Sequence, residues 1–317
     1  MSELEPFFFP LNSKRNPLTG MIRKQRIVTH LEWLNQADFT SLNLRNQAMQ
    51  SLIVLTALLA VALGKAVRPR KIVTATSGYA YAVDLAVPVP LSAFTCMKNY
   101  GYSTVFVRAY DPTSAGKFDM NAVNNIRNAK KAGLGSEVFM TPQPRSVKKG
   151  SQQFTEMYKG FKRADIKLKT VWVQVTSPIN WNRDTKANIN FLRDILSMAK
   201  YYGVAIGFYT NVHDWTQITN GATAEGTMLW YWNVMGGGRN GETPANFNDF
   251  RPFAKVTKPT VKQFAQMEDV CGVTVNRDVY VLNRSTRTLA SAPGDSNGKL
   301  IVGSIGEGLV PELVQIV

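Results

Sequence analysis

The chain has 317 residues, 44% of them hydrophobic, and carries 37 Lys and Arg against 22 Asp and Glu. This length allows one large hydrophobic core or two modest ones. The positive charge favours anionic partners such as bacterial walls, acidic glycans or membrane surfaces. No array of Lys and Arg stands on a recognisable nucleic-acid reading motif, so we expect no nucleic-acid partner. No spacing of His, Cys and carboxylates suggests a metal, and we expect no cofactor.

The first marked feature along the chain is the run from Leu52 to Leu63, which is apolar apart from Thr56. It is too short to span a bilayer, which takes about 20 residues. It matches the apolar part of a secretory signal, and small residues follow it where a peptidase could cut. We therefore predict an upstream extension over 1–48, disordered or mis-assigned, translation from Met49, a signal peptide over 49–66, and a secreted, extracellular protein. A buried core helix and an uncleaved signal-anchor stay open, because a start at Met49 leaves no Lys or Arg before the run.

From residue 79 onward, short apolar strands alternate with amphipathic helices. Strands are predicted at 81–85, 104–110, 137–140, 171–175 and 205–209, and helices near 91–100, 120–132, 152–164 and 185–202. Gly101, Gly133 and Gly203 follow three of the helices, where the chain needs a residue that accepts positive φ. Such alternation is typical of a parallel sheet or barrel.

After a short helix near 214–218 the rhythm changes. Residues 228–234, 261–266 and 272–275 are predicted strands without long helices between them. Five βα units followed by three strands would close an incomplete version of the eight-fold βα barrel. We therefore predict an α/β protein with a TIM-like (βα)5β3 barrel, formed as a single domain over residues 79–280. Residues 281–317 lose the pattern and are predicted to be a C-terminal tail, poorly ordered or wrongly assigned.

The segment from Val171 to Pro178 is predicted to be a buried strand that runs into a loop. Side chains alternate along a strand, so Trp172, Gln174 and Thr176 share one face. A closed barrel would point that face inward, toward the mouth at the carboxyl ends of its strands, where such folds do chemistry. The mouth then carries an amide and a hydroxyl rather than a pair of acids.

The two cysteines, Cys96 and Cys271, lie far apart in the sequence. In an exported protein an even number of cysteines favours a disulfide, here between the early and late parts of the chain. Closing so long a loop would stabilise the fold by about 4–5 kcal/mol in the chain-entropy description. Two unpaired buried thiols remain the alternative.

Seven linked segments stand in the same order along the chain: Tyr81–Leu85, Phe94–Lys98, Val107–Tyr110, Val171–Pro178, Gly207–Thr210, Leu229–Trp232 and Cys271-Gly272. Together they resemble the invertebrate, nematode-type lysozymes of glycoside hydrolase family 25, over roughly residues 80–280. The resemblance implies a (βα)5β3 barrel that acts on bacterial peptidoglycan in antibacterial defence (innate immunity) or digestion. It also implies a disulfide between Cys96 and Cys271. We expect a monomer without stable membrane insertion.

Lysozymes of this family carry an Asp-x-Glu pair at the end of the fourth strand, and the matching positions here are Gln174 and Thr176. The acid of the first strand is kept as Asp84, whereas an Asp of the last strand is replaced by Asn276. Glycosidic cleavage needs a proton donor and negative charge near the cationic sugar. Neither an amide nor a hydroxyl supplies them. We therefore expect muramidase activity to be weak or lost, and a pseudo-enzyme that binds peptidoglycan or another glycan without cutting it is the alternative.

Amides, hydroxyls and aromatic faces can still bind sugars. The predicted substrate-binding residues are Gln174, Thr176, Tyr209, Trp230, Trp232 and Asn276. On a strand Trp230 and Trp232 share one face and Tyr231 takes the other. For each aromatic residue, core packing is the alternative role.

Two loop acids, Asp111 and Asp214, are candidates to replace the missing catalytic acid. Each is explained more simply as a cap or a solvated loop residue, and the simpler role of His213 is to order its own loop.

A third function is also open, in which the protein is a cationic antimicrobial that acts through surface charge alone.

Overall fold

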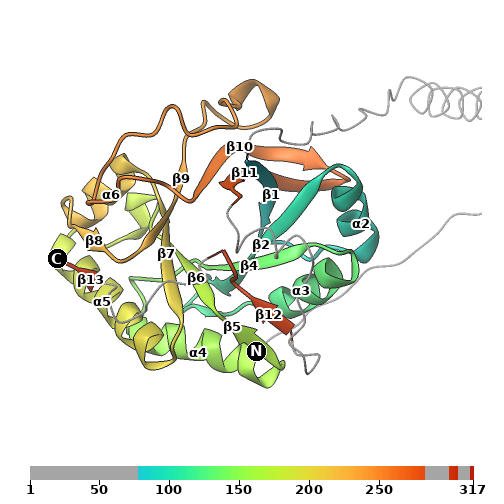
Figure 1. The fold of residues 1–317 in the computed structure, drawn as a ribbon. Coiled ribbons are helices and arrows are strands. Elements are labelled where there is room, and N and C mark those ends of the chain that lie inside the picture. The colour runs from blue at the N-terminus through green and yellow to red at the C-terminus, as the bar shows by residue number, and fades with distance from the viewer. Residues whose placement is uncertain (1–77, 283–299, 306–314) are drawn as a thin grey trace, which may run out of the picture. The chain divides into compact units, whose positions relative to one another are not determined.

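The computed structural model describes residues 78–282, 300–305 and 315–317. The predicted extension over 1–48 and the predicted signal peptide over 49–66 lie outside these residues. Within them, eight strands close into a barrel (Figure 1), in the order β1 (Tyr79–Leu85), β2 (Tyr102–Asp111), β4 (Gly135–Met140), β6 (Thr170–Gln174), β7 (Ala205–Thr210), β9 (Met228–Trp232), β10 (Val261–Val270) and β11 (Val273–Val281). Neighbours from β1 round to β10 are parallel. Strand β11 is antiparallel to both β10 and β1 and closes the ring.

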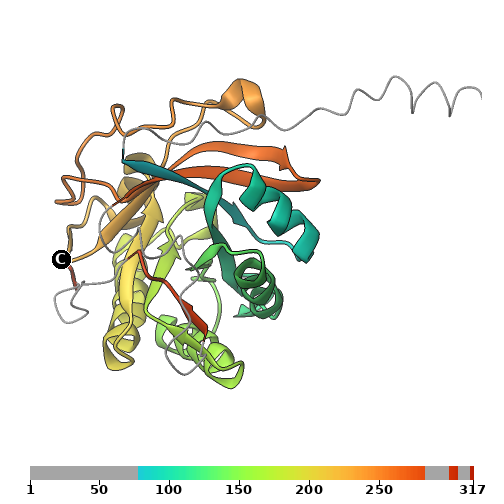
Figure 2. The same ribbon diagram turned by 45° about the vertical axis from the view of Figure 1, so that its right-hand side comes forward.

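The helices lie outside the ring of strands (Figures 1 and 2). They are α2 (Leu91–Asn99), α3 (Asn121–Lys131), α4 (Gly150–Arg163), α5 (Thr185–Tyr201) and α6 (Val212–Thr219), with short 3-10 turns η1 (Pro178–Asn180) and η2 (Arg239–Gly241). In the described residues each of these helices follows one of the first five barrel strands, and β9, β10 and β11 come last. The predicted (βα)5β3 barrel is confirmed.

One strand is much longer than the prediction of 272–275. Strand β11 extends to Val281 because residues 276–281 pair with β1 and residues 273–280 pair with β10. A strand of mixed polarity gives a weak sequence signal, and here the two neighbouring strands hold it.

Short strands form further pairings in addition to those of the eight barrel strands. Strand β3 (Lys117–Phe118) pairs with β2, β12 (Leu300–Val302) with β5 (Ile166–Leu168), and β13 (Gln315–Ile316) with β8 (Ala224–Glu225). Two of these pairings come from the predicted tail, which therefore contributes to the fold at 300–302 and 315–316. Elements of two or three residues are too short for a periodic pattern to predict.

The barrel interior is filled mainly by aromatic side chains, among them Trp172 from β6 and Trp230 from β9, whose ring centroids are 6.0 Å apart. Gly207 on β7 leaves the space for this packing. A Cβ atom at that position would lie 2.4 Å from the Trp172 ring. The predicted inward orientation of Trp172 is confirmed, because this side chain belongs to the interior cluster and is fully buried.

The side of the barrel formed by β10 and β11 is covered by the segment between β9 and β10, which contains η2, rather than by an α-helix (Figure 1). Phe247 from this segment packs edge-on against Tyr79, and the buried ammonium of Lys262 binds the Asp249 carboxylate at 2.7 Å. In the described residues, no helix combines the length and the apolar character needed to cross a membrane.

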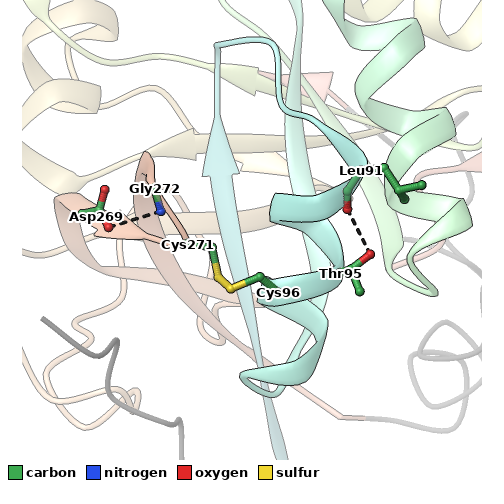
Figure 3. The surroundings of a disulfide bond; sticks show 6 residues. All are labelled: Leu91, Thr95, Cys96, Asp269, Cys271 and Gly272. Carbon is green, nitrogen blue, oxygen red and sulfur yellow. Dashed lines mark hydrogen bonds between the residues drawn. A yellow bond between two sulfur atoms is a disulfide. The ribbon is translucent and has the colours of Figure 1, made fainter. Parts of the chain in front are cut away.

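A disulfide ties the last two barrel strands to the first βα unit. Cys271, in the turn between β10 and β11, is bonded to Cys96 of α2 with a Cα–Cα distance of 6.0 Å (Figure 3). The predicted pairing is confirmed. Because β11 carries polar residues of the site described below, the bond helps to fix their position relative to β1.

Candidate functional site

A cavity of about 450 Å³ opens at the carboxyl ends of β2, β4 and β6. Its lining comes from the three loops that follow these strands: Pro112, Thr113, Ser114, Thr141, Pro142, Gln143, Arg145, Gln174, Thr176, Ser177, Asn180 and Trp181. This is the end of the barrel where βα folds place their ligand sites. The predicted residues Gln174 and Thr176 both line it.

Gln174 and Thr176 belong to one hydrogen-bonded chain of neutral groups. The Thr141 hydroxyl donates to Oε1 of Gln174 at 2.6 Å, and Nε2 of Gln174 donates to Oγ1 of Thr176 at 3.0 Å. The Trp181 indole donates to the backbone carbonyl of Thr176 at 3.0 Å, which fixes the turn after the strand. The chain can bind polar groups but holds no proton that is acidic near neutral pH.

Asp84 and Asn276 lie on β1 and β11 and are not part of the cavity lining. They face each other in the antiparallel register, and Nδ2 of Asn276 donates to Oδ1 of Asp84 at 2.9 Å. Asn276 also accepts a hydrogen bond from the backbone of Met267 at 3.0 Å. The two predicted residues are therefore brought together, with Asp84 only 4% exposed.

A second acid, Asp278, joins Asp84 and was missed by sequence reasoning. It is fully buried, and its Oδ1 accepts a hydrogen bond of 2.9 Å from the Trp230 indole. Since side chains alternate along β11, Asp278 points to the same side of the strand as Asn276, and this spacing was the available signal. Although Asn276 stands where the family resemblance expects an Asp, this region therefore holds two acids, Asp84 and Asp278.

The two carboxyl groups influence each other's protonation. Burial raises the pKa of Asp84 to about 7, and hydrogen bonds from Asn276 and Asp278 offset part of that rise. Burial also raises the pKa of Asp278 well above its usual value, and the nearby charge of Asp84 adds to the effect. Ionising both of two adjacent carboxyl groups in a buried site costs much free energy, so we infer that the pair of Asp84 and Asp278 holds a proton near neutral pH.

A further buried acid lies inside the barrel at Glu137 of β4. It accepts hydrogen bonds of 3.0 Å from the Trp172 indole and from the backbone of Ile305, which packs into the barrel interior. Burial raises the pKa of Glu137 to about 7. The backbone of Ser304 also donates to Glu137, so this side chain ties residues 304 and 305 to the barrel.

The predicted aromatic residues divide into two groups. Trp230 is fully buried and Tyr209 is 6% exposed; their rings stack with centroids 4.0 Å apart inside the barrel, outside the cavity lining. Both rings are therefore packed in the barrel interior. Trp232, at the end of β9, is half-buried. Tyr231 takes the other side of the strand, where its hydroxyl donates to Asp249 at 2.6 Å.

The two loop acids, Asp111 and Asp214, have different surroundings. Asp111 accepts hydrogen bonds from the backbone and hydroxyl of Thr113. Burial alone would raise the pKa of Asp111, but these bonds and the charges of Arg108 and Lys117 bring it below its usual value. It is an ionised structural acid, as the simpler explanation expects.

Asp214 of α6 is buried next to the loop that follows β6. Its Oδ2 accepts a hydrogen bond of 3.4 Å from the backbone of Ser177, a cavity-lining residue with φ of 56°. Burial raises the pKa of Asp214. His213 is exposed and contacts Gln217 of its own helix, at 2.9 Å. In the part of the chain that the structure describes, no group of three His, Cys, Asp or Glu side chains is placed to hold a metal ion.

Comparisons with known proteins agree with this geometry. A family model described as Lysozyme-like protein 1 matches residues 75–264. Lysozyme-like protein 1 of Caenorhabditis elegans is 48% identical over 247 residues, covering 74% of this chain and 83% of that protein. Probable GH family 25 lysozyme 2 of Dictyostelium discoideum is 30% identical over 212 residues, covering 66% of this chain and 93% of that protein.

Solved structures share the barrel. A muramidase from Trichobolus zukalii superposes with a TM-score of 0.51 at 17% identity, over 68% of this chain and 100% of that one. A family GH25 lysozyme from Aspergillus fumigatus gives a TM-score of 0.51 at 15% identity, over 67% and 99%. At this identity the likeness shows the fold, whereas the sequence relatives show the family. The chain belongs to the lysozyme-like proteins of glycoside hydrolase family 25.

Proposed function

We propose that this protein binds the glycan of bacterial peptidoglycan at the cavity and cleaves it slowly or not at all. The observation that carries the proposal is the hydrogen-bonded pair Gln174 and Thr176, which occupies the cavity where the family resemblance expects an Asp-x-Glu pair. The names of the relatives, lysozyme and muramidase, support peptidoglycan as the ligand. Amides and hydroxyls that are already fixed in place suit sugar hydroxyl and acetamido groups.

The expected loss of activity follows from the chemistry of glycoside cleavage. A general acid must protonate the leaving oxygen, and a second carboxylate must stabilise or attack the cationic sugar. Losing one general acid removes about 10²–10⁴ in rate. The cavity lining contains no carboxylate, so both functions are missing there.

A second candidate function is slow hydrolysis that uses Asp84 as the proton donor. The observation in its favour is the pKa of Asp84, which burial raises to about 7, close to the value that suits a general acid at neutral pH. Against it, the side chain is almost fully buried and lies outside the cavity lining.

The experiment compares wall pelleting and wall lysis, measured as loss of turbidity, for the full chain and for Asp84→Asn. Pelleting that resists salt, without lysis, is the expected result. Robust lysis that Asp84→Asn abolishes would replace the binding proposal with the hydrolytic one. Pelleting that disappears at high salt, with no effect of Asp84→Asn, would mean that surface charge alone drives the association.

A gain-of-function variant tests the assignment of the cavity. Gln174→Asp combined with Thr176→Glu should create or raise lytic activity, because it restores two acids at the mouth. The matched control is Thr216→Glu combined with Gln217→Asp, which makes the same charge change on exposed positions of α6. A correctly folded Gln174→Asp, Thr176→Glu protein that stays inert on walls would contradict this assignment.

We also propose that the protein is secreted as a monomer and serves in antibacterial defence or digestion. The disulfide supports an oxidising compartment. N-terminal sequencing of the secreted protein should find a first residue after the 49–66 segment. A first residue before Met49 would contradict the predicted start.

A further inference from the structure

We infer that the cavity takes a sugar that bears an anionic oxygen group, and that Arg145 is the residue that recognises this group. The inference rests on the proposed glycan binding and adds which glycans are selected. It starts from the charges of the loops that form the cavity.

One of the three lining loops carries positive charge without any acid. Residues 141–149 contain Arg145, Lys148 and Lys149 and no Asp or Glu, whereas the loop over 175–184 contains Arg183 next to Asp184. Lys148 is committed, since its ammonium binds Glu156 at 2.9 Å and the carbonyl of Gly116 at 2.8 Å. Of these cations, Arg145 is the one that lines the cavity.

The guanidinium of Arg145 is held in place, and only some of its hydrogen-bond donors have partners. Its Nε and Nη2 both donate to the backbone carbonyl of Trp181, at 3.0 and 2.7 Å. Among the described residues its Nη1 has no hydrogen-bond partner, and its guanidinium has no ion pair. A guanidinium fixed on one edge by a neutral carbonyl keeps its full charge and free donors for a ligand.

The surroundings of Arg145 favour an anion as that ligand. The other lining side chains are amides, hydroxyls, prolines and one indole, so Arg145 is the one formally charged residue among the cavity lining. Its loop is stiffened by Gln143, whose Nε2 donates to the carbonyl of Pro112 at 2.9 Å and whose Oε1 accepts from the backbone of Arg145 at 3.2 Å. A preformed site of this kind loses little conformational entropy when a carboxylate or phosphate binds.

Bacterial walls offer two sources of such a group, the carboxylates of peptide-bearing amino sugars and the phosphodiesters of wall polymers. Of the two, the carboxylate belongs to the short peptide that the amino sugar itself carries. A sugar seated among the amides and hydroxyls of the cavity would therefore bring it to Arg145. A neutral amino-sugar chain of the same length would use the polar lining but leave the guanidinium without a partner.

The test measures, by calorimetry on the full chain, binding of a neutral probe, chitobiose, and an anionic probe with the same number of sugars, a disaccharide-dipeptide fragment of peptidoglycan. Arg145→Gln should weaken binding of the anionic probe about tenfold, as expected for loss of a charge-assisted hydrogen bond at an exposed site, and that of chitobiose less than twofold. Arg145→Lys should retain most of the affinity. The matched control Arg183→Gln removes the same charge outside the cavity lining and should change neither affinity by more than about twofold.

Four results would overturn the inference. Equal losses for both probes in Arg145→Gln would mean that Arg145 only supports the Trp181 loop. A loss in Arg183→Gln as large as that in Arg145→Gln would mean diffuse attraction. Equal affinity of the wild type for both probes would remove the selectivity while leaving glycan binding intact, whereas binding of neither probe would overturn the proposed function as well.

The two sources are separated with whole walls. Walls are compared before and after treatment with hydrofluoric acid, which strips phosphodiester-linked polymers. Arg145-dependent pelleting that survives the treatment assigns the carboxylate of the peptide-bearing amino sugar. Arg145-dependent pelleting that is lost with the polymers assigns the phosphodiester.

Discussion

Asn276 donates a hydrogen bond of 2.9 Å to Asp84 across 192 residues of sequence, from the directly opposite position on the neighbouring strand. The contact exists because β11 runs antiparallel to β1 and closes the barrel. The same register places Asp278 opposite Ala82, whose small side chain leaves room for a second buried carboxyl group.

Replacing Asp278 by Asn should stabilise the protein above neutral pH. Burial raises the pKa of Asp84 to about 7 and that of Asp278 well above its usual value, so the folded state holds more protons than the unfolded state from about pH 4 up to at least pH 7. Stability therefore falls as pH rises through this window, and Asp278→Asn should remove part of the fall while its Oδ1 still accepts from Trp230. At pH 8 the free energy of unfolding should rise by about 1–4 kcal/mol.

The measurement is urea unfolding of wild type and Asp278→Asn at pH 4.5 and pH 8. The gain should be largest at pH 8 and shrink toward pH 4.5. Asp194→Asn, a change of the same kind on α5, is the control. A gain of equal size at both pH values would count against a shared buried proton.

Replacing Gly207 by Ala should destabilise the barrel. The new Cβ atom would lie 2.4 Å from the Trp172 ring, which is fully buried and packs against Phe106 and Trp230. Overpacking of this kind costs about 1–3 kcal/mol. Gly237→Ala is the control, because its Cβ would meet ordinary contacts of 3.4 Å or more. Thermal melting of both variants checks this, and equal melting temperatures would contradict the packing argument.

Removing the disulfide by Cys96→Ser should lower the free energy of unfolding by about 2–5 kcal/mol, because it frees a loop closed over 175 residues. The hairpin of β10 and β11 should loosen first, since the bond anchors its turn to α2. Hydrogen exchange of β11 and thermal melting report the two effects. Reductant should lower the stability of wild type and leave Cys96→Ser unchanged; sensitivity of the variant to reductant would refute the assignment.

Asp214 should act on ligand binding through the turn at Ser177. Its carboxylate accepts from the Ser177 backbone, and Ser177 has the left-handed φ of 56° that non-glycine residues adopt at some cost. Asp214→Ala should therefore weaken wall binding about three- to tenfold, whereas Asp214→Asn, which keeps an acceptor oxygen, should weaken it less. Wall pelleting at fixed salt measures this. Equal losses in the two variants would favour a role for the charge itself.

The sequence by itself determined the order of the elements, the (βα)5β3 barrel and the presence of Gln174 and Thr176 at its mouth. These features depend on local periodicity, because alternation along one strand decides which side chains point inward. It also separated Tyr231 from its neighbours Trp230 and Trp232. It did not decide how deep each residue lies: Trp230 is buried in the interior, and Trp232, two residues further along the same strand, is half-buried at the mouth.

Only the tertiary structure decided which acids meet and where a ligand fits. Asp278 joins Asp84 through the register of two strands from opposite ends of the domain, and no local pattern encodes that register. The cavity depends in the same way on three loops whose backbones are fixed by contacts between them, such as the one from Arg145 to Trp181. Long-range pairing and loop packing are properties of the folded chain. The place of Arg145 in the cavity, to which we assign ligand recognition, could therefore be identified only from the tertiary structure.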